Sequence, residues 1–260
     1  MRPILAVFML LTLTACSLFG SKSDADNPAK TASAEVLYND AKKSLDKSNF
    51  EEAIKQLESL QSRYPYGRYA QQAQLDIAYA YYRQNEPESA ISAADSFIKQ
   101  YPNNPHVDYA YYVKGLANFN PGIGAFGLTF GQDPTERDPQ AEQDSFAAFK
   151  DLVSRFPSSR YAPDSRLRMQ YLLDALAKYE IHVAKYYLRR GADIAAVNRA
   201  KVVLTQYPNT PSIQDALLIL VQGYDALGMN KLRDDARRVL DLNFPRAASA
   251  ANKVSSASSQ

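Results

Sequence analysis

The 260-residue sequence contains one cysteine, two histidines and no tryptophan. A single cysteine cannot form an internal disulfide, and two histidines provide too few ligands for a zinc site at a recognisable spacing. An excess of charge of one sign is also missing, since 30 Lys and Arg face 28 Asp and Glu and the formal net charge is +2. Nucleic-acid-binding proteins normally present a basic face, so we expect no nucleic acid partner.

Sequence motifs of catalysis are equally scarce. The chain has no G-x-S-x-G, the motif that presents the nucleophile of many serine hydrolases. Gly122, Gly124 and Gly127 form a G-x-G-x-x-G, but dinucleotide binding requires a strand before this motif and a helix that starts within it. Two carboxylates could still form a glycosidase site across space, although no feature indicates one. We therefore predict a protein that is not an enzyme, with no catalytic residues and no metal site.

The N-terminus has the pattern of a lipoprotein signal peptide. Arg2 provides a positive charge, residues 4–13 form an apolar run too short to span a bilayer, and "LTAC" ends at Cys16. This pattern is typical of a lipobox, so we expect a signal peptide at residues 1–15 and a covalent lipid on Cys16, with no other cofactor. The alternative is an ordinary signal peptide with an incidental cysteine. Ser17, in place of an aspartate, favours the outer membrane by similarity to lipoprotein sorting rules.

Two terminal segments lack the apolar periodicity of a folded core. Residues 16–33 are rich in Ser, Asp, Lys and small residues, which predicts a flexible tether behind the lipidated cysteine. A coil of that length reaches roughly 20–25 Å on average, so the folded part is expected close to the membrane surface. Residues 246–260 are rich in Ala and Ser and are predicted to be a disordered tail.

A recurring ending divides the rest of the chain, in which apolar residues recur at spacings of three and four as in helices. In five places an apolar run ends in a tyrosine or phenylalanine followed by proline. The intervals between these prolines are 37, 55, 51 and 37 residues. A period near 37 with two expansions predicts helix–turn–helix repeats with insertions. The five prolines are Pro65, Pro102, Pro157, Pro208 and Pro245.

Positions counted back from each proline support the repeat. Twelve residues earlier the first four repeats have a small residue, which lets two helices approach closely, and five residues earlier every repeat has an apolar one. The positions twelve back are Ala53, Ala90, Ser145, Ala196 and Arg233, and those five back are Leu60, Phe97, Leu152, Val203 and Leu240. This pattern resembles tetratricopeptide (TPR) repeats, so we predict an all-α fold, a TPR-like helical-hairpin solenoid of five repeats.

The two expansions mark departures from the repeat. Residues 118–140 contain four Gly and three Pro, which predicts an irregular loop insertion in repeat 3. We favour a loop packed on the repeats, with a partner contact as the alternative. Residues 163–191 contain no Gly or Pro between their first and last positions, which predicts an elongated helix before repeat 4, as one helix or two nearly continuous ones. Fourteen extra residues correspond to about 21 Å of helix.

Tyrosine is abundant, with 18 residues, and gathers in two helical segments at 69–84 and 106–119. Each segment has two apolar stripes, of which one is needed for packing between helices. A second stripe could line a groove for a bound chain, because tyrosine combines a large contact area with a polar tip. The alternative, that both stripes lie between repeats, is equally open for any single tyrosine.

Longer stretches resemble one family. The lipobox, the repeats, "RYPYGRYAQQAQLDIAYAYYR" at 63–83, "RDPQ" at 137–140, "LAKYE" at 176–180 and "VNR" at 197–199 are similar to the BamD family. Its members are lipoproteins of the β-barrel assembly machinery in the outer membrane of Gram-negative bacteria. The resemblance covers residues 13–245 and implies a non-enzymatic, lipid-anchored scaffold on the periplasmic face of that membrane.

The resemblance also implies partners and site residues. Family members dock on the POTRA domains of the barrel protein BamA, bind the lipoproteins BamC and BamE, and receive the C-terminal targeting strand of unfolded outer-membrane proteins. The implied division is a substrate groove in residues 34–117, which hold repeats 1 and 2, and partner docking in residues 118–245, which hold repeats 3 to 5. Arg199 of "VNR" is the implied ion-pair residue for BamA. The implied groove tyrosines are Tyr64, Tyr66, Tyr69 and Tyr82.

A barrel targeting strand ends in a carboxylate, which leads to one further expectation. Arg63 or Arg68, near the mouth of the groove, is expected to bind that carboxylate. The rival function is a TPR lipoprotein that recruits or activates a cell-wall hydrolase, which the repeats and the lipobox fit equally well. Only the family-like stretches at 63–83 and 176–199 separate the two, and they favour barrel assembly.

Overall fold

The computed structural model describes residues 32–119 and 139–245, and these residues form ten α-helices and no strand. The expected all-α class is therefore confirmed for the part of the chain that the structure describes. The predicted signal peptide, Cys16 and the tail at 246–260 lie outside the described residues, as do most of the tether and most of the segment at 118–140.

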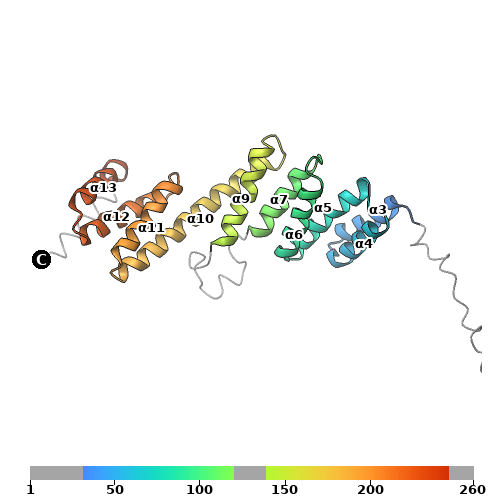
Figure 1. Ribbon diagram of the computed structural model, residues 1–260, viewed down its shortest axis with the longest axis horizontal. Coiled ribbons are helices and arrows are strands. Elements are labelled where there is room, and N and C mark those ends of the chain that lie inside the picture. The colour runs from blue at the N-terminus through green and yellow to red at the C-terminus, as the bar shows by residue number, and fades with distance from the viewer. Residues whose placement is uncertain (1–31, 120–138, 246–260) are drawn as a thin grey trace, which may run out of the picture.

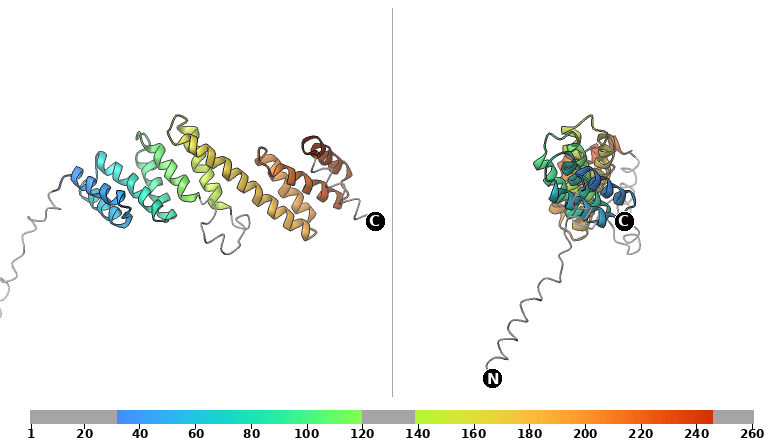
Figure 2. Two further views of the ribbon diagram at one scale, coloured as in Figure 1. Left: turned by 180° about the vertical axis from the view of Figure 1, so that it is seen from behind. Right: turned by 90° about the vertical axis from the view of Figure 1, so that its right-hand side faces the viewer.

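The helices pack one after another into an elongated stack (Figure 1). Each helix contacts its neighbours in the sequence. The view from behind shows the same elongated shape, and the view from the end shows its narrow cross-section (Figure 2). This arrangement is the TPR-like solenoid that the repeat predicts. In order, the helices are α3 (Ala34–Asp46), α4 (Phe50–Arg63), α5 (Arg68–Arg83), α6 (Pro87–Gln100), α7 (Val107–Asn118), α9 (Gln140–Arg155), α10 (Ala162–Arg189), α11 (Asp193–Gln206), α12 (Ile213–Ala226) and α13 (Asn230–Asn243).

The aromatic-proline endings stop five helices in the same way. Each aromatic residue leaves the helical conformation, with φ between −127° and −138°, because a following proline disfavours the α region. Its N–H still donates to a carbonyl four residues earlier, at 2.7–3.0 Å. That carbonyl belongs to the buried apolar residue five before the proline. The capping residues of α4, α6, α9, α11 and α13 are Tyr64, Tyr101, Phe156, Tyr207 and Phe244.

A second regularity, which the sequence analysis missed, lies in the turn inside the hairpins. Seventeen residues before four of the prolines the backbone is left-handed, with φ between +59° and +70°. The N–H of the next residue then bonds to a carbonyl five residues earlier, which closes the preceding helix. These residues are Ser48 and Asn85 near the N-terminus, and Gly191 and Gly228 near the C-terminus. Only glycine adopts this conformation without a steric cost.

The small residues twelve before the prolines lie where helices touch. Those of the first four repeats are fully buried. Arg233, the one large residue at these positions, is not fully buried, and its guanidinium forms an ion pair with Asp225 at 2.7 Å. The five apolar residues five before the prolines are all at most 2% exposed. The pattern therefore identified the contact positions of the helices correctly.

The segment at 163–191 forms one continuous helix, α10, of 28 residues. Its start packs with α9, where Ala162 joins a core shared with α5, α6 and α7. Its later turns pack with α11 and α12, where Ala177, Ile181 and Ala184 join a separate core. We call α3–α9 with the first half of α10 the N-terminal stack, and the second half of α10 with α11–α13 the C-terminal stack. Because α7 packs on both α6 and α9, the helical packing continues from one side of the segment at 118–140 to the other. The division of roles between residues 34–117 and 118–245 stays a prediction.

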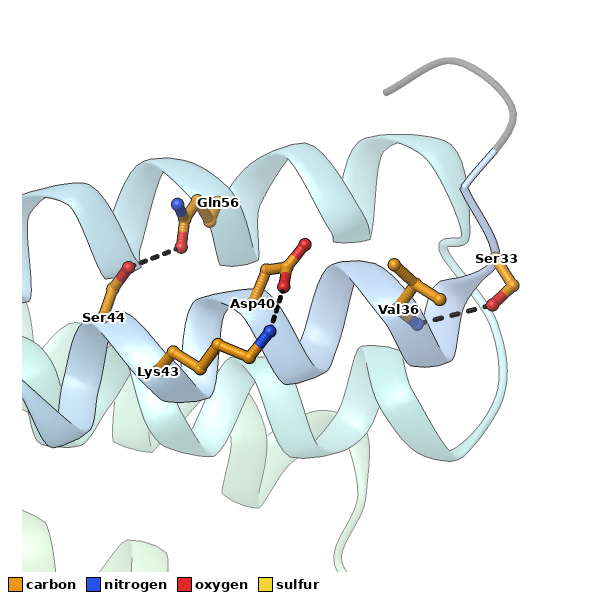
Figure 3. Close-up of polar contacts among 6 residues, drawn as sticks. All are labelled: Ser33, Val36, Asp40, Lys43, Ser44 and Gln56. Atoms are coloured by element: carbon orange, nitrogen blue, oxygen red, sulfur yellow. Dashed lines mark hydrogen bonds and ion pairs between the residues drawn. The ribbon is translucent and has the colours of Figure 1, made fainter. Parts of the chain in front are cut away.

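Local hydrogen bonds secure the first hairpin (Figure 3). The Ser33 hydroxyl accepts from the N–H of Val36 at 3.4 Å and caps α3. Further along the same helix, the Ser44 hydroxyl donates to the side-chain carbonyl of Gln56 on α4, at 2.9 Å. A neutral hydrogen bond thus joins the two helices of this hairpin.

Candidate functional site

The first candidate site lies at the junction between α4 and α5. Tyr64 is 36% exposed, and its hydroxyl donates to the carbonyl of Ala32 at 3.0 Å. Tyr66 is 91% exposed, and Arg63 is exposed at the last residue of α4. A tyrosine with so little cover contributes almost nothing to the core, so it is available for a bound chain. We call this group the first-junction rim, made up of Arg63, Tyr64, Tyr66, Arg68 and Tyr69.

Arg68 and Tyr69 form the start of α5 and lie against each other. The Arg68 guanidinium lies 4.6 Å from the centroid of the Tyr69 ring, and its Nη2 donates to the Tyr69 hydroxyl at 2.8 Å. The Tyr69 ring packs in turn on Tyr38 of α3, with 5.5 Å between the centroids. The rim therefore presents cationic and aromatic groups side by side, which suits a carboxylate that follows aromatic side chains.

Tyr82, the remaining predicted groove residue, lies away from this rim. It stands thirteen residues after Tyr69 on the same helix, which corresponds to about 20 Å. There its ring lies 6.5 Å from that of Tyr79, and it lines a hollow of about 460 Å³ together with Pro87 and Phe119. The structure thus brings five of the six predicted groove residues together and leaves the sixth at the opposite end of α5.

A buried carboxylate lies between the N-terminal helices, and the sequence analysis missed it. Asp76 of α5 is 6% exposed and accepts from the Tyr38 hydroxyl of α3 at 2.7 Å. Burial raises the pKa of the Asp76 carboxyl, against the opposing effect of hydrogen bonds from Tyr38 and Gln72. The signal in the sequence is an acidic residue inside the apolar run "QLDIAY". This contact ties α3 to α5, so its role is to hold the stack together.

A second tyrosine–carboxylate contact ties α7 to α10. The Tyr112 hydroxyl donates to Asp164 at 2.8 Å, and Arg168 Nε donates to the same carboxylate oxygen at 2.6 Å. Burial alone would raise the pKa of the Asp164 carboxyl, but the hydrogen bonds from Arg168 and Tyr112 lower it overall. Burial also raises the pKa of Tyr112 to about 12, so this hydroxyl stays protonated as a donor.

The tyrosines of the segment at 106–119 mostly pack between helices. Tyr109 and Tyr112 both lie against Tyr161, with ring centroids 5.2 and 4.7 Å apart. Tyr111 is 9% exposed and lies 5.8 Å from Phe156. For these three residues the interpretation as packing between repeats is correct. The exposed tyrosines lie elsewhere, with Tyr64 and Tyr66 at the first-junction rim and Tyr171 and Tyr186 on α10.

The second candidate site centres on Arg199 of α11, the predicted docking residue. Its Nη1 lies 3.2 and 3.4 Å from the two carboxylate oxygens of Glu180 on α10. The Arg199 side chain is 43% exposed, whereas that of Glu180 is 12% exposed. Burial, and then the nearby Glu180 carboxylate, raise the pKa of Tyr207 at the end of α11. The structure thus joins the stretches "LAKYE" and "VNR", and Glu180 is a residue that sequence reasoning missed.

An apolar groove of about 560 Å³ lies between α11, α12 and α13 at the end of the C-terminal stack. Leu232 and Val239 of α13 line it and are each 44% exposed. We call it the C-terminal groove, and its lining residues are Leu204, Pro208, Thr210, Ile213, Leu217, Leu220, Tyr224, Leu232, Asp235, Ala236, Val239, Asn243 and Phe244.

Four lining positions that are apolar in the C-terminal groove are polar at the matching places in α4, α5 and α6. Counted from their prolines, the residues equivalent to Leu204 and Leu217 are Gln61 and Gln74, and those equivalent to Leu232 and Val239 are Ser89 and Ser96. All four are polar in the early hairpins and apolar in the last ones. The solenoid itself therefore does not require apolar side chains at these positions, and the exposure of Leu232 and Val239 marks the C-terminal groove as a binding surface.

Other kinds of site are not seen in the described ranges. Within residues 32–119 and 139–245, no group of three or more His, Cys, Asp and Glu side chains is placed to hold a metal ion. The two histidines lie on different helices, His106 at the N-cap of α7 and His182 within α10. None of the described helices has both the length and the apolar composition required to cross a bilayer.

Comparison with known proteins gives a consistent set of relatives. A family model described as "YfiO: Outer membrane lipoprotein" matches residues 30–239. A protein from Neisseria meningitidis serogroup B is 42% identical over 246 residues, covering 95% of this chain and 92% of the relative. Relatives from Xylella fastidiosa and Haemophilus influenzae are 37% and 33% identical and cover 93% and 90% of this chain, and 80% and 89% of their own length. All three are named outer membrane protein assembly factor BamD, a name that describes no enzyme.

Solved structures add a likeness of shape alone. A kinesin light chain with TPR-like repeats from Podosopora anserina is 15% identical, covers 84% of this chain and 95% of its own, and superposes with a TM-score of 0.35. That score is too low to support an argument about function. The assignment of the fold therefore rests on the ten helices and their packing.

Proposed function

This chain belongs to the BamD family of outer membrane lipoproteins, and we propose on that basis that it is a non-enzymatic assembly factor for outer-membrane β-barrel proteins. In this proposal it is a lipid-anchored scaffold on the periplasmic face of the outer membrane. The observation that supports it best concerns two regions near opposite ends of the molecule, the α4–α5 junction and α11–α13 (Figure 1). Their exposed surfaces differ in chemistry. One is aromatic and cationic and the other is aliphatic, as expected of a scaffold with two kinds of partner.

The proposed substrate surface is the first-junction rim. The C-terminal strand of an unfolded barrel protein would place its carboxylate against Arg63 or Arg68 and its aromatic side chains against Tyr64 and Tyr66. An extended strand rises about 3.3 Å per residue, so six residues span about 20 Å. That length matches the distance along α5 from Tyr69 to Tyr82. In this arrangement Tyr82 contacts the strand upstream of its C-terminus.

The proposed docking surface for the POTRA domains of BamA lies on the C-terminal stack. Arg199 of α11 offers an exposed guanidinium for an ion pair. The C-terminal groove, which α11 forms with α12 and α13, offers an apolar surface. Interfaces combine such a buried apolar centre with polar contacts that set orientation. BamC and BamE are the further lipoprotein partners in this proposal. The lipid on Cys16 would hold the whole assembly at the membrane.

Docking can be tested by capture of the protein from detergent-extracted envelopes through a C-terminal tag, followed by mass spectrometry. We expect stoichiometric recovery of BamA with the unchanged chain and its loss with Arg199→Glu. Lys99→Glu, on the exposed face of α6, makes the same charge change outside residues 118–245 and is expected to leave recovery unchanged. Recovery of cell-wall hydrolases without BamA would contradict the proposal.

Substrate binding can be tested with a labelled peptide that ends in a barrel targeting strand. Replacing both Arg63 and Arg68 by Ala is expected to weaken binding at least tenfold, since a charge-assisted hydrogen bond to the carboxylate is lost. Amidation of the peptide C-terminus should have the same effect on the unchanged protein and no further effect on the double variant. Equal affinity of all four combinations would rule out the assigned role of these arginines. Tyr82→Ala should weaken binding of a ten-residue peptide but not of one shortened to its last four residues.

A further inference from the structure

The contact between Glu180 and Arg199 is unusual for its position in the repeat. Glu180 stands 28 residues before its proline and Arg199 stands nine before it. In repeats 1, 2 and 5 the same two positions hold neutral pairs. These pairs are Leu37 with Gln56, Gln74 with Ala93, and Leu217 with Ala236.

The neutral pairs show that the fold does not require charges there. In the last hairpin Leu217 and Ala236 are 3% and 8% exposed and line one apolar surface. In the first hairpin Gln56 takes a neutral hydrogen bond from Ser44 instead (Figure 3). A carboxylate that is 12% exposed loses much of its hydration, and the attraction to one arginine seldom gains more than that loss. Stability alone therefore gives little reason for a charged pair in repeat 4.

The geometry leaves most of the Arg199 guanidinium available. Both short distances to Glu180 involve Nη1. Nε and Nη2 donate no hydrogen bond to any described residue, and 43% of the side chain is exposed. Arginine is planar and presents its donors as a rigid fork, so a carboxylate that holds one nitrogen also sets the direction of the others.

We propose that Glu180 is a positioning residue for docking: it holds Arg199 by Nη1 so that Nε and Nη2 together meet a carboxylate side chain on the partner. This inference rests on the proposed docking of the C-terminal stack on a POTRA domain. The partner's carboxylate approaches a guanidinium that is already ordered, so less side-chain entropy is lost on binding. Lysine cannot replace Arg199 here, because one ammonium group cannot serve two carboxylates in fixed directions.

The opposite role for Glu180 makes a contrary prediction. If Glu180 only neutralised Arg199 or competed with the partner for it, removing the Glu180 charge would leave docking unchanged or make it tighter. If Glu180 positions Arg199, removing the charge weakens docking, and does so only while Arg199 is present. The sign of the effect and its dependence on Arg199 therefore decide between the two.

The experiment measures the affinity of the purified chain for purified POTRA domains of BamA by calorimetry, with thermal melting of every variant. We expect Arg199→Ala to weaken binding at least thirtyfold, and Glu180→Gln and Arg199→Lys to weaken it about tenfold each. Glu180→Gln in the Arg199→Ala background should cause no further change. The double variant Glu180→Leu with Arg199→Ala copies Leu217 and Ala236 of the last hairpin, so it should melt at or above the unchanged chain and still fail to dock.

Each outcome bears on a different claim. Unchanged or tighter binding of Glu180→Gln, with Arg199→Ala still weakened, overturns the positioning role alone. An equal loss from Glu180→Gln with and without Arg199 also overturns it, because Glu180 would then act through a contact of its own. Unchanged binding of Arg199→Ala overturns the proposed docking residue itself. If Glu180→Gln lowers the melting temperature, the exchanged pair Glu180→Arg with Arg199→Glu restores an ion pair. It should recover the melting temperature without recovering docking, and recovered docking would refute the proposal.

Discussion

The two stacks that α10 joins use the same repeat with different side chains. In the N-terminal stack the cores contain large rings such as Phe97 and Phe149, and tyrosine hydroxyls bind carboxylates between helices. The core of the C-terminal stack is mostly aliphatic, with Val203 in the position of Phe97. Its α10 and α12 are linked by an exposed ion pair between Lys185 and Asp215 at 2.6 Å. The turns differ too, with Ser48 and Asn85 in one stack and Gly191 and Gly228 in the other.

These differences show which features the repeat requires and which are free to vary. The buried small residues, the apolar residue before the aromatic cap and the left-handed turn recur in both stacks. The outer surface is free to vary, since Ser89 and Ser96 of α6 are replaced by Leu232 and Val239 in α13. One architecture can thus present an aromatic rim at one end and an aliphatic groove at the other.

The largest expected effect tests whether the stacks unfold separately. Phe97→Ala should cost about 3–5 kcal/mol of unfolding free energy, because it removes a fully buried ring. Val203→Ala, at the matching position, should cost about 2 kcal/mol, since fewer buried atoms are lost. Native-state hydrogen exchange should show lost protection mainly in α5–α7 for the first variant and in α11–α12 for the second. Equal loss across all helices in both variants would mean that α10 couples the stacks into one cooperative unit.

The next effect concerns the helix that joins the stacks. Eight residues after their prolines, Ala73, Ala110 and Ala216 are fully buried, and Ser165 of α10 takes the same place. Its hydroxyl is buried without a hydrogen-bond partner among the described residues. Ser165→Ala should therefore raise the unfolding free energy by about 1 kcal/mol. Ala110→Ser is the matched reverse change and should lower it by a similar amount in chemical denaturation. Stabilisation by Ala110→Ser would contradict this prediction, because it would show that a hydroxyl at this position finds a hydrogen-bond partner.

A smaller effect is expected in the turns. Gly191→Ser copies Ser48 and should cost about 0.5–1 kcal/mol of unfolding free energy, because serine is strained at positive φ. Serine loses less conformational entropy on folding than glycine does, but this offsets only part of the strain. No atom lies within 4 Å of the position of an added Cβ at Gly191, so the loss is purely one of backbone strain. Ser48→Gly should stabilise the N-terminal stack by a similar amount. Thermal melting of both variants is the test, and changes of the same sign would contradict it.

The smallest effect is a pH dependence confined to the N-terminal stack. The pKa of Asp76 is raised by burial, so its contribution to stability is present below about pH 4 and is lost as the pH rises through the raised pKa. The pKa of Asp164 is lowered overall, so its contribution is present above about pH 4 and is lost as the pH falls through the lowered pKa. Asp76→Asn should therefore gain stability relative to the unchanged chain between pH 4 and 7. Asp164→Asn should lose stability near neutral pH and differ little in strong acid. Urea denaturation from strong acid to pH 7 measures both.

Much of the fold follows from local rules and could be predicted. A proline restricts the residue before it and cannot continue a helix, so the ends of five helices followed from five positions. Spacing to Ala53, Ala90 and Ala196 identified where helices touch. The length of α10 as a single helix remained open, because an uninterrupted run of helix formers is compatible with one helix or two. The four left-handed turns escaped notice, because serine and asparagine stand in place of glycine in the first two repeats and hide the regularity.

The candidate sites, like the fold, have features that depend on residues close together in the chain and features that depend on how the helices pack. The sequence by itself determined the repeat, the helix ends, the family and the concentration of Tyr and Arg at residues 63–69, because each depends on residues close together in the chain. Only the tertiary structure decided that Tyr82 lies far from that rim and that Glu180 meets Arg199. The packing of helices also decided that the apolar side chains of α11, α12 and α13 form one groove. The physical reason is that such contacts depend on the angle and offset at which whole helices pack, which the spacing of residues along one helix does not specify.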